Sequence, residues 1–369
     1  MNNNHVLLIG IGQRYDDSKA IEVTAKDATR LASEFSHRYR YNSDNVIPLV
    51  SEQASRAKVM HQLDTLIAKT KEKQADLVVI FFSGHGVKKN GQFFLISRDA
   101  EKENLKYTAI EGNVFIQTIN EINAKAVLIL LNCCYSGAIQ GDGYESADIP
   151  FDKNSFIQKP NRAIITACSG SEKAFTSTPL SIFTYALVSG LAGECLKNKG
   201  KKKVGLFDLA MYIRETVVAL SKNKQHPELE VLEHSSATNF DIVDYTTGIP
   251  PFEKEERGGI YDALGNELKF PHTIEEDTDY RNRFKWLGSM KNTVIDSNIE
   301  ADNLHIGDTT IGQVYQQGDN PEIKNAVIGS TIKAKNVSIG DNVINVRGND
   351  SNVIFNNPNS TITINRGGK

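Results

Sequence analysis

Two runs of six apolar residues constrain most strongly how this chain can fold. Leu77–Phe82 reads LVVIFF, and Ala126–Leu131 reads AVLILL. A strand with one face in water alternates apolar and polar residues, whereas a continuous apolar run indicates a strand covered on both faces. Such strands belong to sheets whose parallel strands are joined by helices. The two runs therefore predict an α/β fold with a mostly parallel sheet flanked by helices.

The neighbouring segments support that fold, because strand-like and helix-like stretches alternate along residues 1–245. Further strands are expected at Val6–Ile11, Asn45–Val50, Phe93–Ile96, Ala163–Ala167 and Phe240–Val243, and helices from Thr24 and over Lys58–Lys71, Val114–Ile122, Ser181–Ala192 and Leu206–Leu220. Residues 246–289 contain the adjacent prolines Pro250 and Pro251 and little periodicity. We expect a linker there, with a short structured patch at Phe284–Leu287.

Residues 290–369 differ from the rest of the chain because they contain an internal repeat. Asn292–Ile311 and Asn325–Ile344 are identical at 11 of 20 positions when aligned at an offset of 33. Ile and Val recur at short intervals between turn-forming residues, which predicts short strands stacked as the rungs of a β-solenoid. A weaker segment, Asn352–Ile364, continues the pattern. A disordered polar tail is the alternative, and the regular spacing of Ile and Val argues against it.

Composition excludes several classes of protein. The net charge of -3 gives no sign of a nucleic-acid binder, and four cysteines are too few for a disulfide framework. The start of the chain has no basic region, and Val6–Ile11 is too short for a signal core or a membrane span. We therefore expect no membrane partner and a cytoplasmic, reducing location, which suits a reactive thiol.

A histidine and a cysteine follow the two apolar runs. His85 lies in Ser83–Gly86 and Cys134 in Asn132–Gly137, and both segments are expected to be loops. The carboxyl ends of parallel strands meet at one edge of a sheet, where ligands bind. Taken singly, the cysteine is more typical of core packing and the histidine of a polar loop. Together they indicate a thiol nucleophile with its base.

The stretches LVVIFFSGHG and AVLILLNCCYSGA, which set His85 and Cys134 49 positions apart, resemble the caspase/metacaspase superfamily of cysteine peptidases. Further on, TACSGSEKAFT, SIFTYALVSGLAG and QHPELE are similar to the second half of that domain, so the resemblance covers about residues 5–245. It implies a caspase-like fold and an endopeptidase acting on protein or peptide substrates. The metacaspase pattern Asp-x-Cys-x-Ser-Gly selects Cys134 as nucleophile and leaves Cys133 for packing.

The resemblance also implies a mechanism. His85 takes the thiol proton, Cys134 attacks the scissile carbonyl, and the backbone N–H groups of Gly86 and Cys134 hold the oxyanion. This chemistry needs no metal. Some metacaspases require calcium, and the acidic loop Gly141–Asp152 could supply ligands, but its spacing is not that of an EF-hand, so a solvated loop is favoured.

Substrate preference follows from the same family. The acidic pocket that selects Arg or Lys in metacaspases corresponds here to Asp27, Ser83 and Asn132. Asn132 departs from the family, which carries Asp there, so one carboxylate remains. Caspases that cut after Asp use arginines in this pocket. We therefore expect cleavage after basic residues with weakened selection, although Asp27 could instead simply begin or solvate a helix. Lys153–Arg162 and Lys197–Lys203 are candidate processing segments.

The sequence raises two rival functions, and its residues argue against both. A catalytically inactive caspase-like scaffold would keep the fold as a binding platform, and the intact His85–Cys134 pair argues against it. A nucleotide loop at Gly10–Gly12 lacks its third glycine, because Tyr15 stands in that place. The tail, residues 290–369, is expected to bind a regulatory protein partner or to self-associate. Bacterial relatives carry such modules in antiviral defence or cell-death systems.

Overall fold

The computed structural model describes residues 3–12, 22–38, 41–134, 156–168, 172, 174, 177–196, 200–231, 239–246, 259–262 and 264–268. Cys134 and the strands between residues 294 and 366 are described by their backbone. The chain divides into two compact units. One contains residues 1–232 and 238–276, and the other contains 233–237 and 277–369.

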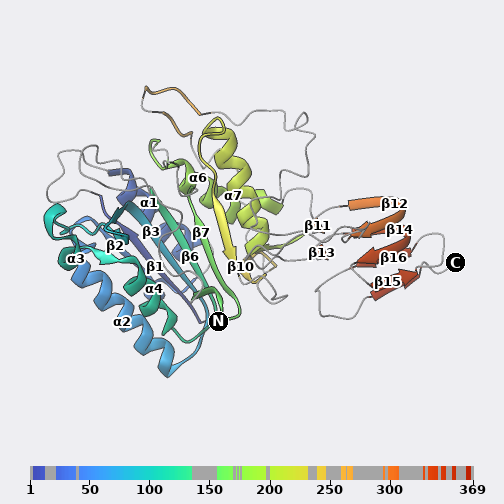
Figure 1. Cartoon of the computed structure of the whole chain (residues 1–369), viewed down its shortest axis with the longest axis horizontal. Coiled ribbons are helices and arrows are strands. Elements are labelled where there is room, and N and C mark those ends of the chain that lie inside the picture. The colour runs from blue at the N-terminus through green and yellow to red at the C-terminus, as the bar shows by residue number, and fades with distance from the viewer. Residues whose placement is uncertain are drawn as a thin grey trace. The chain divides into compact units, whose positions relative to one another are not determined.

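The first unit alternates strands and helices, as its apolar pattern predicts (Figure 1). Its elements are β1 (Asn4–Gly10), α1 (Glu22–Ser33), β2 (Val46–Val50), α2 (Arg56–Glu72), β3 (Ala75–Lys89), β4 (Gln92–Leu95), α3 (Leu105–Thr108), β5 (Ile110–Glu111), α4 (Gly112–Asn120), β6 (Ala124–Cys134), β7 (Arg162–Thr166), α6 (Ile182–Leu191), β8 (Lys203–Gly205), α7 (Leu206–Leu220), β9 (Glu228–Val231) and β10 (Asp241–Asp244).

The central sheet is mostly parallel. Its strands run in the order β2-β1-β3-β6-β7-β9. The pairs from β2 to β7 are parallel, and β9 is antiparallel to β7. The two apolar runs lie in β3 and β6, side by side at the centre of this order, which explains why neither alternates.

Helices cover both faces of the sheet (Figure 1). On one face, Leu63 of α2 and Phe115 of α4 join Ile80, Phe82 and Ile129 in a continuous buried core. On the other face α1 packs on β1 and β3, with α6 and α7 packed together beside it. Residues of β3 and β6 therefore alternate between two helical layers, and the parity of a residue decides which layer its side chain meets.

The segments Ser83–Gly86 and Asn132–Cys134 are strand rather than loop, which corrects the prediction for these residues. β3 continues through the glycines because its ladder with β6 continues, pairing Ser83 with Asn132. Beyond it, Gly86 to Lys89 form a hairpin with β4. Backbone pairing on both sides thus holds a glycine-rich sequence extended, although glycine alone disfavours a strand. Residues 135–137 lie outside the described residues.

The late strand expected at Phe240–Val243 exists as β10, but it pairs with β8 in a separate two-stranded sheet. The last strand of the central sheet is instead β9, whose sequence, ELEV, carries two charged side chains and is only four residues long. Short charged edge strands are common because they discourage pairing with other chains, and they leave a weak signal in the sequence.

Part of the predicted linker belongs to the first unit. Residues 259–262 and 264–268 form a small hairpin in which Leu268 N–H donates to the Ile260 carbonyl at 2.9 Å. The patch expected at Phe284–Leu287 lies outside the described residues. No helix in the described part of the chain is long and apolar enough to cross a membrane.

In the second unit, two parallel strand pairs match the sequence repeat. β12 (Asn298–Ile306) pairs with β14 (Thr331–Ile339) so that Asn298 faces Thr331 and Ile306 faces Ile339, an offset of 33 residues in both cases. β11 (Val294–Ile295) pairs with β13 (Val327–Ile328) at the same offset. The remaining strands, β15 (Asn342–Asn345), β16 (Ser351–Ile354) and β17 (Thr363–Arg366), pair antiparallel, so the weaker segment Asn352–Ile364 is not stacked as a third parallel rung.

Candidate active site

The carboxyl ends of β3 and β6 bring the predicted catalytic residues to adjacent positions. In the parallel register Ser83 faces Asn132 and His85 faces Cys134. Neighbouring strands lie about 5 Å apart, so these facing backbone positions are in direct proximity. His85 is partly exposed, whereas Ser83 is fully buried. The ladder therefore joins residues that are 49 positions apart in the chain.

Strand alternation separates the two adjacent cysteines. Cys133 is 1% exposed and belongs to the core beneath α2 and α4. The thiol of Cys168, in the segment after β7, donates to the Cys133 carbonyl with a sulfur–oxygen distance of 3.6 Å. Cys133 is therefore a buried core residue. The part of Cys134 that the structure describes is its backbone, at the end of β6.

Asp27, Ser83 and Asn132 meet in one buried hydrogen-bonded cluster on the α1 side of the sheet. Ser83 Oγ donates to Asp27 Oδ2 at 3.0 Å, and Asn132 Nδ2 donates to the same oxygen at 3.0 Å. Asp27 and Ser83 are both 0% exposed, and Asn132 is 5% exposed. The structure thus assembles the three positions implied by the metacaspase resemblance, from α1, β3 and β6.

Ser181 completes this cluster, and the sequence analysis did not identify it. Its backbone N–H donates to Asp27 Oδ1 at 3.0 Å, and its hydroxyl accepts from Asn132 Nδ2 at 2.8 Å. The hydroxyl also caps α6 by accepting from Thr184 N–H at 3.2 Å. The available signal was the capping pattern itself, a serine directly before an apolar helix, which predicts the helix start but not a contact with Asp27.

Burial dominates the electrostatics of Asp27. Loss of hydration raises the pKa of its carboxyl to about 6, although the hydrogen bonds from Ser181 and Ser83 act in the opposite direction. Both carboxylate oxygens receive donors, and every donor is neutral. The cluster is therefore built around a single buried acid whose pKa is raised to about 6.

The glycines beside His85 have separate roles. A side chain at Gly84 would place its Cβ 2.6 Å from Ile11 Cγ1, so glycine at this position permits close packing against Ile11, the residue that follows β1. The carbonyl of His85 accepts from Ile96 N–H at 2.9 Å, on the β4 side of the strand. Backbone groups of successive strand residues point to opposite sides, so those of Gly86 are directed toward β6, where Cys134 lies.

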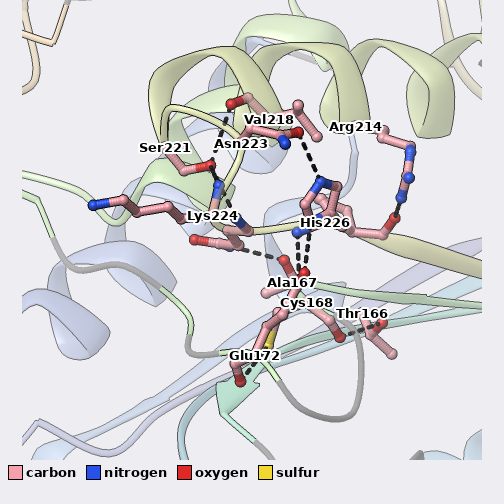
Figure 2. Close-up of polar contacts among 12 residues, drawn as sticks. Thr166, Ala167, Cys168, Glu172, Arg214, Val218, Ser221, Asn223, Lys224 and His226 are labelled. Atoms are coloured by element: carbon pink, nitrogen blue, oxygen red, sulfur yellow. Dashed lines mark hydrogen bonds and ion pairs between the residues drawn. The ribbon is translucent and has the colours of Figure 1, made fainter.

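A second polar group secures the adjoining strand end, where β7 meets β9 (Figure 2). Glu172 accepts from His226 twice: from the backbone N–H at 2.7 Å and from Nδ1 at 2.5 Å. Gln225 Nε2 donates to the Ala167 carbonyl at 2.8 Å, and Arg214 holds the Pro227 carbonyl at 2.7 Å. The bonds of Glu172 and Gln225 fix the segment before β9 against the segment after β7, and the bond of Arg214 ties it to α7. Glu172 and His226 are 54 residues apart in the sequence, and no local sequence pattern predicts their contact.

No group of three or more His, Cys, Asp or Glu side chains within the described residues is arranged to hold a metal ion. The acidic loop Gly141–Asp152, considered above for calcium, lies outside the described residues. Of the two candidate processing segments, residues 153–155 and 197–199 also lie outside the described residues, whereas residues 156–162 and 200–203 are described.

Comparisons with known proteins give a family. The family model described as "Caspase domain" matches residues 3–236. No curated protein matches the chain. Among solved structures, protein GSU0716 from Geobacter sulfurreducens is 14% identical, with a TM-score of 0.42, covering 62% of this chain and 92% of its own. The Drosophila initiator caspase Dronc is 10% identical, with a TM-score of 0.44, covering 66% of this chain and 83% of its own. The domain model spans β1 to β9 and includes every element that holds the His85–Cys134 pair and the Asp27 cluster, so this chain belongs to the caspase-domain family of cysteine peptidases.

Proposed function

We propose that this chain is an active cysteine endopeptidase in which His85 and Cys134 are the catalytic pair. One observation carries the proposal: the β3–β6 ladder sets His85 opposite Cys134 at the carboxyl edge of a parallel sheet. Alternation along β6 places Cys133 in the core, and the next position, Cys134, has the parity of Asn132, on the α1 side.

The chemistry follows from this placement. His85 accepts the thiol proton, the thiolate sulfur of Cys134 bonds to the scissile carbonyl carbon, and the carbonyl oxygen gains the negative charge. The Gly86 backbone, directed toward β6, and the Cys134 N–H supply donors to that oxygen. As the C–N bond breaks, His85 returns the proton to the leaving amine. Water then attacks the thioester, and the acid product leaves with the thiol restored.

We further propose that the Asp27 cluster receives the side chain before the cleaved bond and favours Arg or Lys. Asp27 is the acid in this cluster, and its present donors from Ser83, Asn132 and Ser181 are neutral. A cationic side chain would replace part of this set with a charge-assisted bond, which is about twice as strong as a neutral one. Asn132 keeps the cluster singly charged, so selection is weaker than with two carboxylates.

The tail, residues 290–369, is proposed to regulate or recruit the peptidase as a β-solenoid that binds a partner or another copy. The equality of the 33-residue sequence offset and the strand register supports repeated rungs. A place in a bacterial defence or cell-death pathway is part of the same proposal, and it rests on the resemblance alone.

Covalent labelling tests the catalytic pair. Wild-type protein is treated with a peptide chloromethyl ketone ending in Arg, and the modified residue is mapped by mass spectrometry. We expect alkylation of Cys134, slowed by His85→Ala, and faster with Arg than with a matched ketone ending in Asp. The rival function, an inactive scaffold, predicts no selective labelling. Labelling of Cys133, or labelling indifferent to His85, would count against the dyad.

A further inference from the structure

Residues 259–262 and 264–268, here called the strap, belong to the first unit and come after β10 in the chain. Ile260 anchors the strap, because it is 2% exposed. The strap closes on itself through Asp262, whose Oδ1 accepts the backbone N–H groups of Leu264 and Asn266 at 2.9 Å each. Gly265, with φ of +80°, allows the tight turn. The strap is therefore a defined hairpin rather than an arbitrary stretch of linker.

One strap residue pairs with the segment that precedes α6. Thr178 N–H donates to the Tyr261 carbonyl at 2.9 Å, and Tyr261 N–H donates to the Thr178 carbonyl at 2.8 Å. The two residues form an antiparallel bridge. The backbone N–H and carbonyl of Thr178, the two groups that could pair with an extended chain, are thus both hydrogen-bonded to the strap.

The partner of the strap leads directly into the Asp27 cluster. Ser177 Oγ donates to the Leu180 carbonyl at 2.5 Å, which ties the short segment 177–181 together. The next residue, Ser181, donates its N–H to Asp27 and accepts from Asn132. Because segment 177–181 ends in the cluster, we infer that a peptide whose side chain enters the cluster runs beside this segment, as extended peptides bind strand edges through their backbone.

The sequence of the strap differs from that of a cleavable substrate. Residues 259–268 read GIYDALGNEL and contain no Lys or Arg. The strap can thus fill the backbone edge without offering a basic side chain to Asp27, so a peptidase selective for basic residues would not cleave it there.

We propose that the strap is a built-in competitor of the peptide substrate, which occupies the Thr178 edge beside the Asp27 cluster and must leave before an extended peptide binds. This inference rests on the proposed function for the identity of the pocket. Because the strap begins the stretch that leads to the tail, an event at the tail could release it. The apparent affinity for peptide then equals the intrinsic affinity multiplied by the fraction of molecules with the strap released.

Peptide binding, rather than turnover, tests the strap. The full chain carrying Cys134→Ala is titrated into a fluorescein-labelled pentapeptide ending in Arg, and fluorescence anisotropy gives the dissociation constant. Tyr261→Pro removes the N–H that donates to Thr178 and leaves the bonds within the hairpin. Loss of one such hydrogen bond predicts binding about fivefold tighter. The control, Leu264→Ala, changes a side chain at the turn that is 87% exposed and should bind as the parent does.

A reversible disulfide that holds the strap on the segment before α6 tests the opposite change, because Tyr261→Pro loosens the strap. Thr178 and Tyr261 exchange both backbone bonds, and such pairs have Cα atoms about 5.5 Å apart, within the range of a disulfide. In the same background, Thr178→Cys with Tyr261→Cys should abolish peptide binding when oxidised and restore it when reduced. Binding that is unchanged by the disulfide, or weakened by Tyr261→Pro in a folded protein, overturns the proposal, because the strap would then support the pocket rather than compete for it.

The two proposals fail in different ways. Tighter binding in Tyr261→Pro without peptide hydrolysis by the Cys134 protein would refute the peptidase and keep the strap. Hydrolysis with equal binding in all variants would refute the strap and keep the peptidase. Absence of binding in every variant would refute the strap, because its release would then expose no peptide edge.

Discussion

His85 and Cys134 face each other across the β3–β6 ladder, at the last paired position of the two central strands. Each residue follows a six-residue apolar run by three positions, so the hydrophobic register that buries Phe82 against Leu131 also aligns the candidate catalytic pair. A one-residue slip of β6 would transfer its entire side-chain pattern to the opposite face and replace Cys134 by a neighbour. Core packing and the alignment of the site therefore depend on the same register.

Introducing at position 132 the aspartate of the metacaspase pattern should strengthen selection for basic residues. Asn132 Nδ2 donates to both Asp27 and Ser83, so Asn132→Asp exchanges a donor for a second carboxylate. Two close carboxylates raise one pKa, so the gain should appear above neutral pH. We expect the ratio of kcat/KM for Arg over Gln peptides to rise several-fold at pH 8, and the free energy of unfolding to fall by about 1–3 kcal/mol.

The matched control is Asn132→Ala, which removes the same donor without adding charge. It should lower stability and leave the Arg preference no higher than in wild type. An Asn132→Asp protein with unchanged selectivity at pH 8 would exclude position 132 from the substrate pocket.

Asp27 should make the protein less stable as the pH rises through the acid range. Its folded pKa is about 6 against a reference of 3.8, so the folded state binds the proton more tightly. The stabilisation is complete below pH 3.8 and is lost as the pH rises to about 6. The shift of about two units corresponds to about 3 kcal/mol.

Urea unfolding of wild type and Asp27→Asn between pH 4 and pH 7 measures this effect, because the difference between the two proteins cancels other titrating groups. We expect the stability of wild type relative to Asp27→Asn to fall between pH 4 and 6 and to level off above pH 7. A difference independent of pH would show that Asp27 ionises as an ordinary exposed acid.

The Glu172–His226 pair should contribute to the stability of the site without taking part in the chemistry. Both side chains are partly buried, 22% and 26% exposed, and Glu172 accepts two bonds from one residue. Glu172→Gln weakens the charge-assisted bonds and should cost about 1–2 kcal/mol of unfolding free energy. Glu103→Gln, at an exposed position, is the control and should change stability little. A loss of kcat without a loss of stability in Glu172→Gln would mean that the pair acts on the reaction.

Strands that are buried on both faces can be predicted from the sequence of this chain. Strands without such a continuous apolar run can be missed. The apolar runs locate β3 and β6 because both faces of each strand are covered. Their last residues, Ser83–Gly86 and Asn132–Cys134, have loop-like composition and become strand through pairing with neighbouring strands. The edge strand β9 is missed because half of its four residues are charged.

Only part of the candidate site can likewise be predicted from the sequence. Strand ends and the fold rule suffice to bring His85 and Cys134 together, since each follows a recognisable strand. Ser181 could not be assigned, because its contact with Asp27 depends on how α6 sits beside α1, and 154 residues separate the two. The pairing of Tyr261 with Thr178 is likewise invisible in a segment with the composition of a linker.

The most direct test of the account is peptide hydrolysis by four proteins: wild type, Cys134→Ala, His85→Ala and Cys133→Ala, each assayed with fluorogenic peptides ending in Arg, Lys or Asp. We expect wild type to cleave after Arg and Lys, with kcat/KM reduced about a thousandfold or more in Cys134→Ala and His85→Ala. Cys133→Ala should retain turnover, since Cys133 belongs to the core. Turnover that survives Cys134→Ala, or that is lost in a folded Cys133→Ala protein, would contradict the assignment of the nucleophile.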